Sequence, residues 1–167
     1  MSLLKKNLNT KDTKETKVRA LYLWLARLLI AVVVAWNLEC ALVFLLNPTV
    51  FAPGFELSGM PGAAAVRGFA VLFIMWNVPY LLALWQPRRH RLSLWEALAM
   101  QTIGVIGESL ILLTIPIGHS ALHASLLCFI IFDAAGILCL VGAAWLSLKR
   151  PKPRNPRLSI DNLKSTI

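Results

Sequence analysis

Charged residues are scarce in this sequence. Asp, Glu, Lys and Arg make up 15% of its 167 residues, whereas they make up about 25% of an average soluble domain. Hydrophobic residues account for 57% of the chain. This composition excludes an ordinary soluble globular domain and is typical of a chain that lies in a lipid bilayer.

Cysteine is also rare, and its positions exclude one class of site. The chain has three cysteines, Cys40, Cys128 and Cys139, and no two of them are close enough to form a Cys-x-x-Cys redox or zinc motif. Each lies inside a long apolar run. A free cysteine in such a place behaves as a small hydrophobic residue, so we expect these thiols to contribute to packing.

Long apolar runs are the dominant feature of the sequence. There are four of them, at residues 20–46, 63–85, 92–115 and 121–148. Each can cross a hydrocarbon layer of about 30 Å as a helix with a rise of about 1.5 Å per residue. The sequence therefore predicts an all-α integral membrane four-helix bundle. It leaves residues 1–19 as a disordered basic arm and residues 149–167 as a basic tail.

The net charge of +9 is unevenly distributed. Lys and Arg are concentrated in the N-terminal arm, in the turn before residue 92 and in the C-terminal tail, whereas the loops at 47–62 and 116–120 contain neither. By the positive-inside rule, both termini and the middle turn are cytoplasmic, as four spans require. We expect a multi-pass protein of the cell inner (plasma) membrane, with its basic tails next to anionic lipid headgroups and no nucleic-acid partner.

Polar residues inside the apolar runs are the strongest functional signal. A charged side chain at the bilayer centre costs about 2.5 to 3.5 kcal/mol unless it is paired or hydrated. The candidates for a pocket or a polar network are Glu39, Arg67, Gln101, Glu108, His123 and Asp133. Helical rise places four of them at similar depth in the outer half of the bilayer, namely Glu39, Arg67, Glu108 and His123.

Two hypotheses could explain these polar residues: a structural network or a ligand pocket. In a structural network, Arg67 pairs with Glu39 or Glu108, and amide side chains form hydrogen bonds between helices. In a pocket that opens to the outer face, a protonated carboxylic acid serves a quinone, a sterol-like lipid or another small apolar ligand. Since Arg67 cannot neutralise Glu39, Glu108 and Asp133 together, protonated acids are favoured there.

Two further hypotheses concern ions. Carboxylates together with His119 and His123 are the ligand types found in di-metal helix bundles. However, the sequence has no Glu-x-x-His pair, and the two histidines need not share a helix face, so we predict no metal site. The last hypothesis is a proton or ion path along Glu39, Glu108 and Asp133.

Small residues and the outer loop suggest where surfaces meet. Glycine and alanine around Gly136 give the fourth run a face on which another helix could pack closely. If that face binds another subunit, Gly136→Leu disrupts assembly and Glu108→Gln leaves it intact. Phe51 and Phe55 in the outer loop are too apolar for a freely solvated segment, so we expect the loop to pack on the bundle or to lie in the membrane interface.

Three short motifs resemble a known family. They are Ala26-Arg27 in the first run, Asn47-Pro48 before a loop rich in proline and glycine, and Ala65-Val66-Arg67-Gly68 at the start of the second run. Over about half of its length the chain is similar to the small four-helix DoxX-like membrane proteins. This resemblance implies a four-helix topology, an association with quinone-linked redox assemblies, and a structural or pocket role for Arg67. Gly107-Glu108-Ser109 departs from the basic residue expected there.

These features together predict a binding or accessory subunit of a larger membrane assembly. Other membrane subunits or further copies of the chain would be its partners, and a quinone or another apolar molecule its ligand. The alternative is a small membrane enzyme that acts on an apolar substrate, with Glu108 or Glu39 as the acid/base.

Overall fold

The computed structural model describes residues 2–148, and the side chains from Glu15 onward. These residues contain helices and no strand. The elements are α1 (Ser2–Leu46), α2 (Pro48–Phe51), the 3-10 helix η1 (Ala52–Phe55), α3 (Gly59–Trp85), α4 (Arg91–Thr114) and α5 (Ser120–Leu148). Four of the helices are long and apolar enough to cross a membrane, which confirms the predicted all-α multi-pass fold. The predicted tail at 149–167 lies outside the described residues.

The chain divides into two units, and the functional argument concerns one of them. The bundle is formed by Leu21–Leu148, and the other unit consists of Met1–Ala20 and Lys149–Ile167. In the second unit the described part is helical from Ser2, where the sequence predicted a disordered arm. The physical reason is that the first 47 residues contain neither glycine nor proline, so no residue interrupts the backbone hydrogen bonds of α1.

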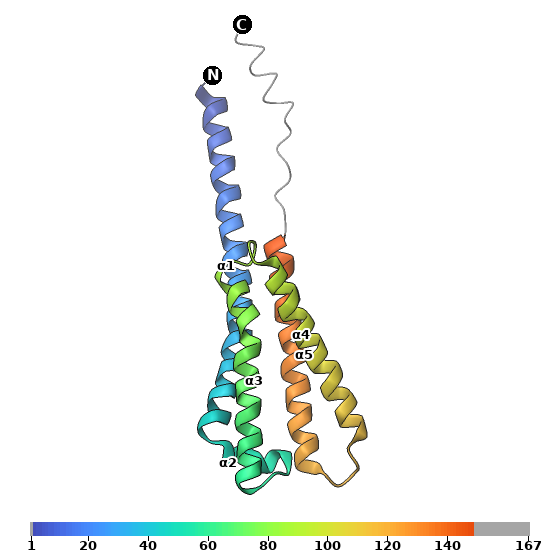
Figure 1. Ribbon diagram of the computed structural model, residues 1–167. Coiled ribbons are helices and arrows are strands. Elements are labelled where there is room, and N and C mark those ends of the chain that lie inside the picture. The colour runs from blue at the N-terminus through green and yellow to red at the C-terminus, as the bar shows by residue number, and fades with distance from the viewer. Residues whose placement is uncertain (1, 149–167) are drawn as a thin grey trace. The chain divides into compact units, whose positions relative to one another are not determined.

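Within the bundle, the four long helices alternate in direction (Figure 1). A short turn at residues 86–90 joins α3 to α4 at one end, and a turn at residues 115–119 joins α4 to α5 at the other. The connection from α1 to α3 contains α2 and η1 and lies at the same end as the second turn. α4 is the shortest of the four long helices. Its 24 residues are about 36 Å long, which is enough to cross the hydrocarbon layer.

Proline residues set the helix boundaries at the loop end. α1 ends before Asn47-Pro48, and α4 ends before Ile115-Pro116. A residue that precedes proline is sterically biased away from the helical region, so both helices stop there. Pro48 then begins α2, where its missing N–H costs nothing. Pro79 lies inside α3, which nevertheless continues to Trp85.

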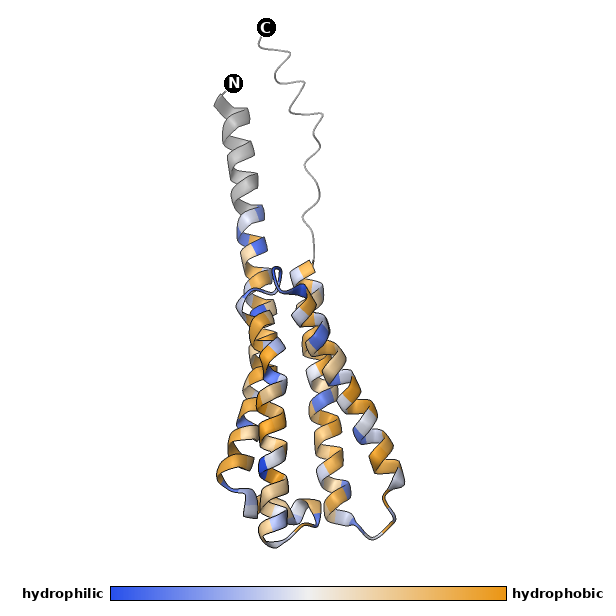
Figure 2. Ribbon diagram, viewed as in Figure 1, coloured by the Kyte–Doolittle hydropathy of each residue, from blue (hydrophilic) through white to orange (hydrophobic). Residues whose placement is uncertain are grey.

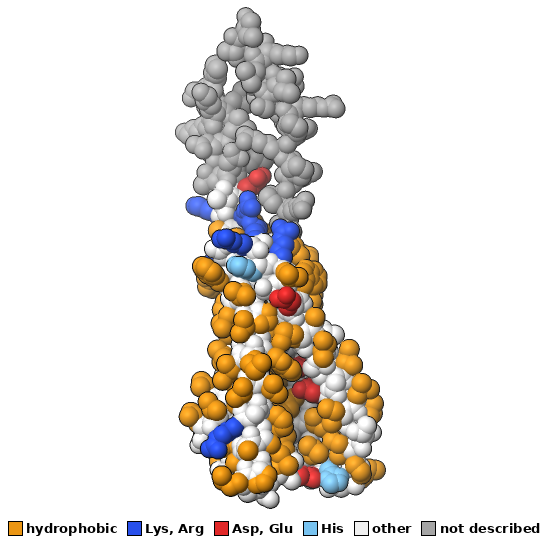
Figure 3. All heavy atoms as spheres, viewed as in Figure 1, with side chains coloured by type: hydrophobic (Ala, Val, Ile, Leu, Met, Phe, Trp, Pro, Cys, Tyr) orange, Lys and Arg blue, Asp and Glu red, His pale blue; other side chains and the backbone are white. Residues whose placement is uncertain are grey.

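The outer surface of the bundle is apolar. Figure 2 shows hydrophobic residues along the long helices, and Figure 3 shows basic side chains gathered toward the end with the 86–90 turn. Large side chains such as Leu113 and Leu138 are 82% and 75% exposed. A surface of this kind matches lipid and would be unfavourable in water. At the basic end of the bundle, the Arg27 Nη2 donates to the Trp85 carbonyl at 2.7 Å.

Two hydrophobic clusters fill the interior. The aliphatic cluster, toward the 86–90 turn, has eleven buried residues: Ala26, Ile30, Val33, Val34, Tyr80, Ala83, Leu94, Ala97, Leu140, Ala143 and Ala144. The aromatic cluster, toward the loop end, consists of buried Phe44, Ala52, Val66 and Ala70 with the rings of Phe51, Phe55, Phe73 and Phe129 packed on them.

Candidate functional site

A half-open cavity of about 550 Å³ lies in the bundle beside the aromatic cluster. Its walls come from α1, α2, η1, α3 and α5. Seven of the lining residues are aromatic: Trp36, Phe44, Phe51, Phe55, Phe73, Phe129 and Phe132. The volume falls within the range of about 300 to 1,000 Å³ that small-molecule sites occupy.

Ring contacts hold the outer loop against this cavity. Phe44 lies with its ring centroid 5.0 Å from that of Phe51 and 5.9 Å from that of Phe55. Phe55 in turn stacks on Phe129 of α5 at 5.9 Å with an interplanar angle of 16°. Aromatic pairs such as these contribute about 0.5 to 1.5 kcal/mol each beyond the burial of their area. Of the two places expected for the loop, on the bundle or in the membrane interface, these contacts show the first for Phe51 and Phe55.

The cavity wall also carries two carboxylic acids. Glu39 of α1 and Asp133 of α5 both line it, with Asn37 and Ser125 as neutral polar neighbours. Glu39 is exposed and Asp133 is half-buried. Among the described residues that line the cavity, none is Lys, Arg or His. The lining therefore holds acids without a basic side chain beside them.

Asp133 is hydrogen-bonded to side chains of two other helices. We call the group of Tyr80 on α3, Gln101 on α4 and Asp133 on α5 the polar bridge. The Gln101 Nε2 donates to the Asp133 Oδ1 at 2.7 Å. The Tyr80 hydroxyl lies 2.5 Å from the Gln101 Oε1 and 3.0 Å from the Ala97 carbonyl, so its single proton can serve either acceptor. Because the amide oxygen faces a hydroxyl donor, the amide NH₂ is left to face the carboxyl group.

Glycine makes the polar bridge sterically possible. Gln101 and Gly104 are three residues apart on α4, and Asp133 and Gly136 are three residues apart on α5. A Cβ atom at Gly136 would lie 2.5 Å from the Gln101 Nε2, and one at Gly104 would overlap the Asp133 Oδ2. Each helix therefore provides a polar side chain and, one turn along, the space that the partner's polar side chain occupies.

This arrangement corrects the expected role of Gly136. The sequence suggested that its face binds another subunit, but Gly136 is buried against Gln101 of the same bundle. α5 packs with α4 along this face. A Gly136→Leu substitution would therefore disturb the fold of the chain itself and is no test of assembly.

Two other predicted residues are half-buried without joining the polar bridge. The Glu108 Oε2 and the His123 Nε2 are buried and have no hydrogen-bond partner in the described part of the chain. Neither residue lines the cavity. Asn77 also has a buried polar atom without a hydrogen-bond partner in the described part of the chain, its Oδ1. Its Nδ2 donates to the Phe73 carbonyl at 2.7 Å.

Arg67 lies apart from the acids with which it was expected to pair. It is exposed on α3, and its side chain makes no hydrogen bond or ion pair within residues 15–148. The reason is helical phase: Val66 and Ala70 are fully buried in the aromatic cluster, and Arg67 is rotated about 100° from Val66 around the helix axis. The structure does not bring Arg67 to Glu39 or Glu108.

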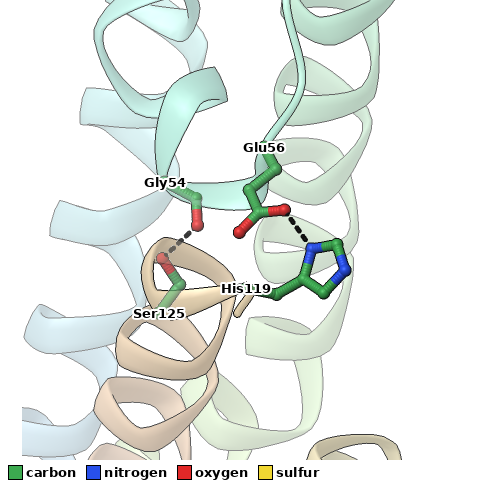
Figure 4. A network of polar contacts seen from close by, with 4 residues as sticks. All are labelled: Gly54, Glu56, His119 and Ser125. Carbon is green, nitrogen blue, oxygen red and sulfur yellow. Dashed lines mark hydrogen bonds and ion pairs between the residues drawn. The ribbon is translucent and has the colours of Figure 1, made fainter. Parts of the chain in front are cut away.

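Two polar contacts tether η1 and the residue after it to the start of α5 (Figure 4). The Ser125 hydroxyl donates to the Gly54 carbonyl at 2.7 Å, and the His119 Nδ1 lies 2.5 Å from the Glu56 Oε2. The hydrogen bond from His119 lowers the pKa of the Glu56 carboxyl below its ordinary value of 4.5. His119 is thus the partner of a loop carboxylate. Across the described residues, no three His, Cys, Asp or Glu side chains are grouped so that they could hold a metal ion.

Sequence reasoning missed Tyr80 and the aromatic lining. The signal for Tyr80 was weak, since one tyrosine in an apolar run does not indicate its partner. The signal for the lining was present, because Phe44, Phe51 and Phe55 recur within a short stretch that enters and follows the bend after α1.

No protein-family model, curated protein or solved structure matches this chain. The resemblance to DoxX-like proteins stays a prediction.

Proposed function

We propose that this protein is a membrane-embedded binding protein that holds a small, largely apolar ligand in its aromatic cavity and serves as an accessory subunit of a larger membrane assembly. The observation that carries the proposal is the 550 Å³ cavity with its seven aromatic residues and few polar groups. Apolar walls with a small number of placed polar side chains are the usual composition of a ligand site.

The position of the cavity suggests from which side it is reached. The cavity lies at the loop end, whereas Arg88, Arg89 and Arg91 lie at or beside the opposite turn. Positive charge favours the cytoplasmic side of a plasma membrane. Both termini are then cytoplasmic, and the cavity lies in the outer half of the bilayer under the α2–η1 loop.

Native mass spectrometry of the protein, gently extracted from its own membrane, tests this function. We expect the chain to carry a discrete small mass and to travel with other membrane chains. The Val43→Phe protein, which fills the cavity from α1, should lose the small mass. The Leu42→Phe protein is the matched control, because Leu42 is 54% exposed and does not line the cavity. A wild-type chain without any bound small mass would overturn the proposal.

A second candidate function is favoured by one lining residue. Glu39 is a carboxylic acid in the cavity wall, so it could exchange a proton with a bound apolar substrate as general acid/base. Glu108, the other candidate for this role, is not a lining residue. If the protein is an enzyme, Glu39→Gln should retain the bound mass and abolish its conversion, whereas Glu108→Gln should convert it normally.

A further inference from the structure

The charge of the cavity wall points to one class of ligand. Two of the lining residues, Glu39 and Asp133, are carboxylic acids, and no lining residue is basic. Arg67 is exposed on α3 and makes no ion pair in the described region, so it does not supply the missing positive charge. A carboxylate at membrane depth is costly until a partner neutralises it.

The rings next to these acids fit the same class. Trp36 and Phe132 both line the cavity and pack edge to face, with centroids 5.6 Å apart at 76°. Glu39 is three residues after Trp36, on the same side of α1, and Asp133 directly follows Phe132 on α5. The faces of tryptophan and phenylalanine attract cations, and the effect grows as the site is desolvated.

One of the two acids is held in place before any ligand arrives. The Gln101 Nε2 donates to the Asp133 Oδ1, and the Tyr80 hydroxyl beside the Gln101 Oε1 favours this orientation of the amide. This hydrogen bond, and the position of the Asp133 Oδ2 beside Gly104, turn both carboxyl oxygens toward α4, which provides no lining residue. Glu39 makes no hydrogen bond to a described residue and can adjust to the ligand.

We infer that the cavity takes a lipophilic cation, a molecule with an apolar or aromatic body and a single positive charge, whose charge is neutralised by Glu39. The inference rests on the proposed binding function and specifies its ligand class. A neutral ligand would leave Glu39 without a counter-charge, and an anion would be repelled by it.

Binding of two matched probes to the full chain in lipid nanodiscs tests this inference. Tetraphenylphosphonium and tetraphenylborate have the same four rings and opposite charge, and a neutral short-chain quinone provides the uncharged comparison. Equilibrium dialysis against empty nanodiscs removes partition into lipid. We expect saturable binding of the phosphonium alone, and its loss in the Val43→Phe protein.

Substitutions then identify the groups that carry the charge preference. Glu39→Gln should weaken phosphonium binding about tenfold or more, because it removes the carboxylate that pairs with the cation. Glu96→Gln is the control, since Glu96 is exposed on α4 and does not line the cavity. Asp133→Asn should weaken binding less than Glu39→Gln does, because both Asp133 carboxyl oxygens face α4. If it fails to fold because the polar bridge is lost, Glu39→Gln alone decides.

The outcomes separate the inference from the function beneath it. Saturable binding of the quinone or the borate, with no phosphonium binding, would overturn the cation inference and leave the binding function standing. Phosphonium binding that Glu39→Gln does not weaken would also overturn it. If none of the three probes saturates and native extraction yields no bound mass, the binding function fails as well.

Discussion

The aliphatic and aromatic clusters pack the two ends of one bundle with different side chains. Five of the eleven buried residues in the aliphatic cluster are alanine, and small residues let helix backbones approach closely. The aromatic cluster uses phenylalanine rings from α1, α2, η1, α3 and α5. The cavity lies beside these rings.

The polar bridge lies where the two clusters meet. Along α5, Asp133 follows Phe129 of the aromatic cluster and precedes Leu140 of the aliphatic cluster. Tyr80 belongs to the aliphatic cluster, while Asp133 lines the cavity. The polar bridge therefore joins the aliphatic cluster to a residue of the cavity wall. Three substitutions test this difference between the aliphatic and the aromatic end of the bundle. They are given from the largest expected effect to the smallest.

Gly104→Ala should be the most damaging of the three. The added Cβ would overlap the Asp133 Oδ2, so Asp133 must shift and strain its bond from Gln101. Overpacking costs about 1 to 3 kcal/mol, and a damaged hydrogen bond to a charged group about 1.5 to 3 kcal/mol. We expect the free energy of unfolding in detergent to fall by about 3 kcal/mol, measured by reversible denaturation.

Gly107→Ala is the matched control on the same helix. A Cβ at Gly107 would have no heavy atom within 4 Å, so the change should stay within about 0.5 kcal/mol. Equal effects at Gly104 and Gly107 would mean that the close approach of α4 and α5 does not depend on the glycine beside Asp133.

The helices of this fold could be predicted from the sequence because their signals are local. A long apolar run predicts a span by its length alone, and Pro48 and Pro116 stop helices through contacts with the residue before them. The start of α1 was harder to predict, because the polar composition of residues 1–19 suggested disorder. The helix continues through this segment because it contains neither glycine nor proline.

The site was predictable only in part because depth in the membrane does not determine which way a side chain points. Gln101 and Asp133 were both candidates, and they do meet. Helical rise predicted a similar depth for Arg67 and Glu39, but Arg67 is one residue out of phase with the buried Val66 and points away from the core. Which helix faces Gly136 depends on how the helices pack, and the sequence does not encode that locally.

Tyr80→Phe should have an intermediate effect. It removes the hydroxyl that faces the Gln101 Oε1 and the Ala97 carbonyl without changing the shape of the ring. The loss of one such bond costs about 1 kcal/mol. Thr102→Val is the control, because the Thr102 hydroxyl donates only to Leu98 in its own helix.

A double-mutant cycle shows whether this effect travels along the polar bridge. Combined with Asp133→Asn, Tyr80→Phe should cost less than it does alone, since residues in one hydrogen-bond network are not additive. Strictly additive losses would mean that Gln101 does not couple the aliphatic end to the cavity wall.

The smallest effect is expected at the loop, where acid should loosen the contact between Glu56 and His119. The pKa of Glu56 lies below its ordinary value because His119 donates to the carboxylate. A lowered pKa in the folded state means that the contact stabilises the fold above about pH 4.5 and that this contribution is lost as the pH falls through the lowered value.

Thermal unfolding at about pH 7 and about pH 3 should therefore give a larger fall in melting temperature for the wild type than for Glu56→Gln, which has no charge to lose. Glu96→Gln, on α4 away from the loop, should retain the wild-type fall. Because Glu56 and His119 are both solvent-accessible, the difference should be small. Identical falls in the wild type and Glu56→Gln would show that the contact between Glu56 and His119 does not help to hold the loop on the bundle.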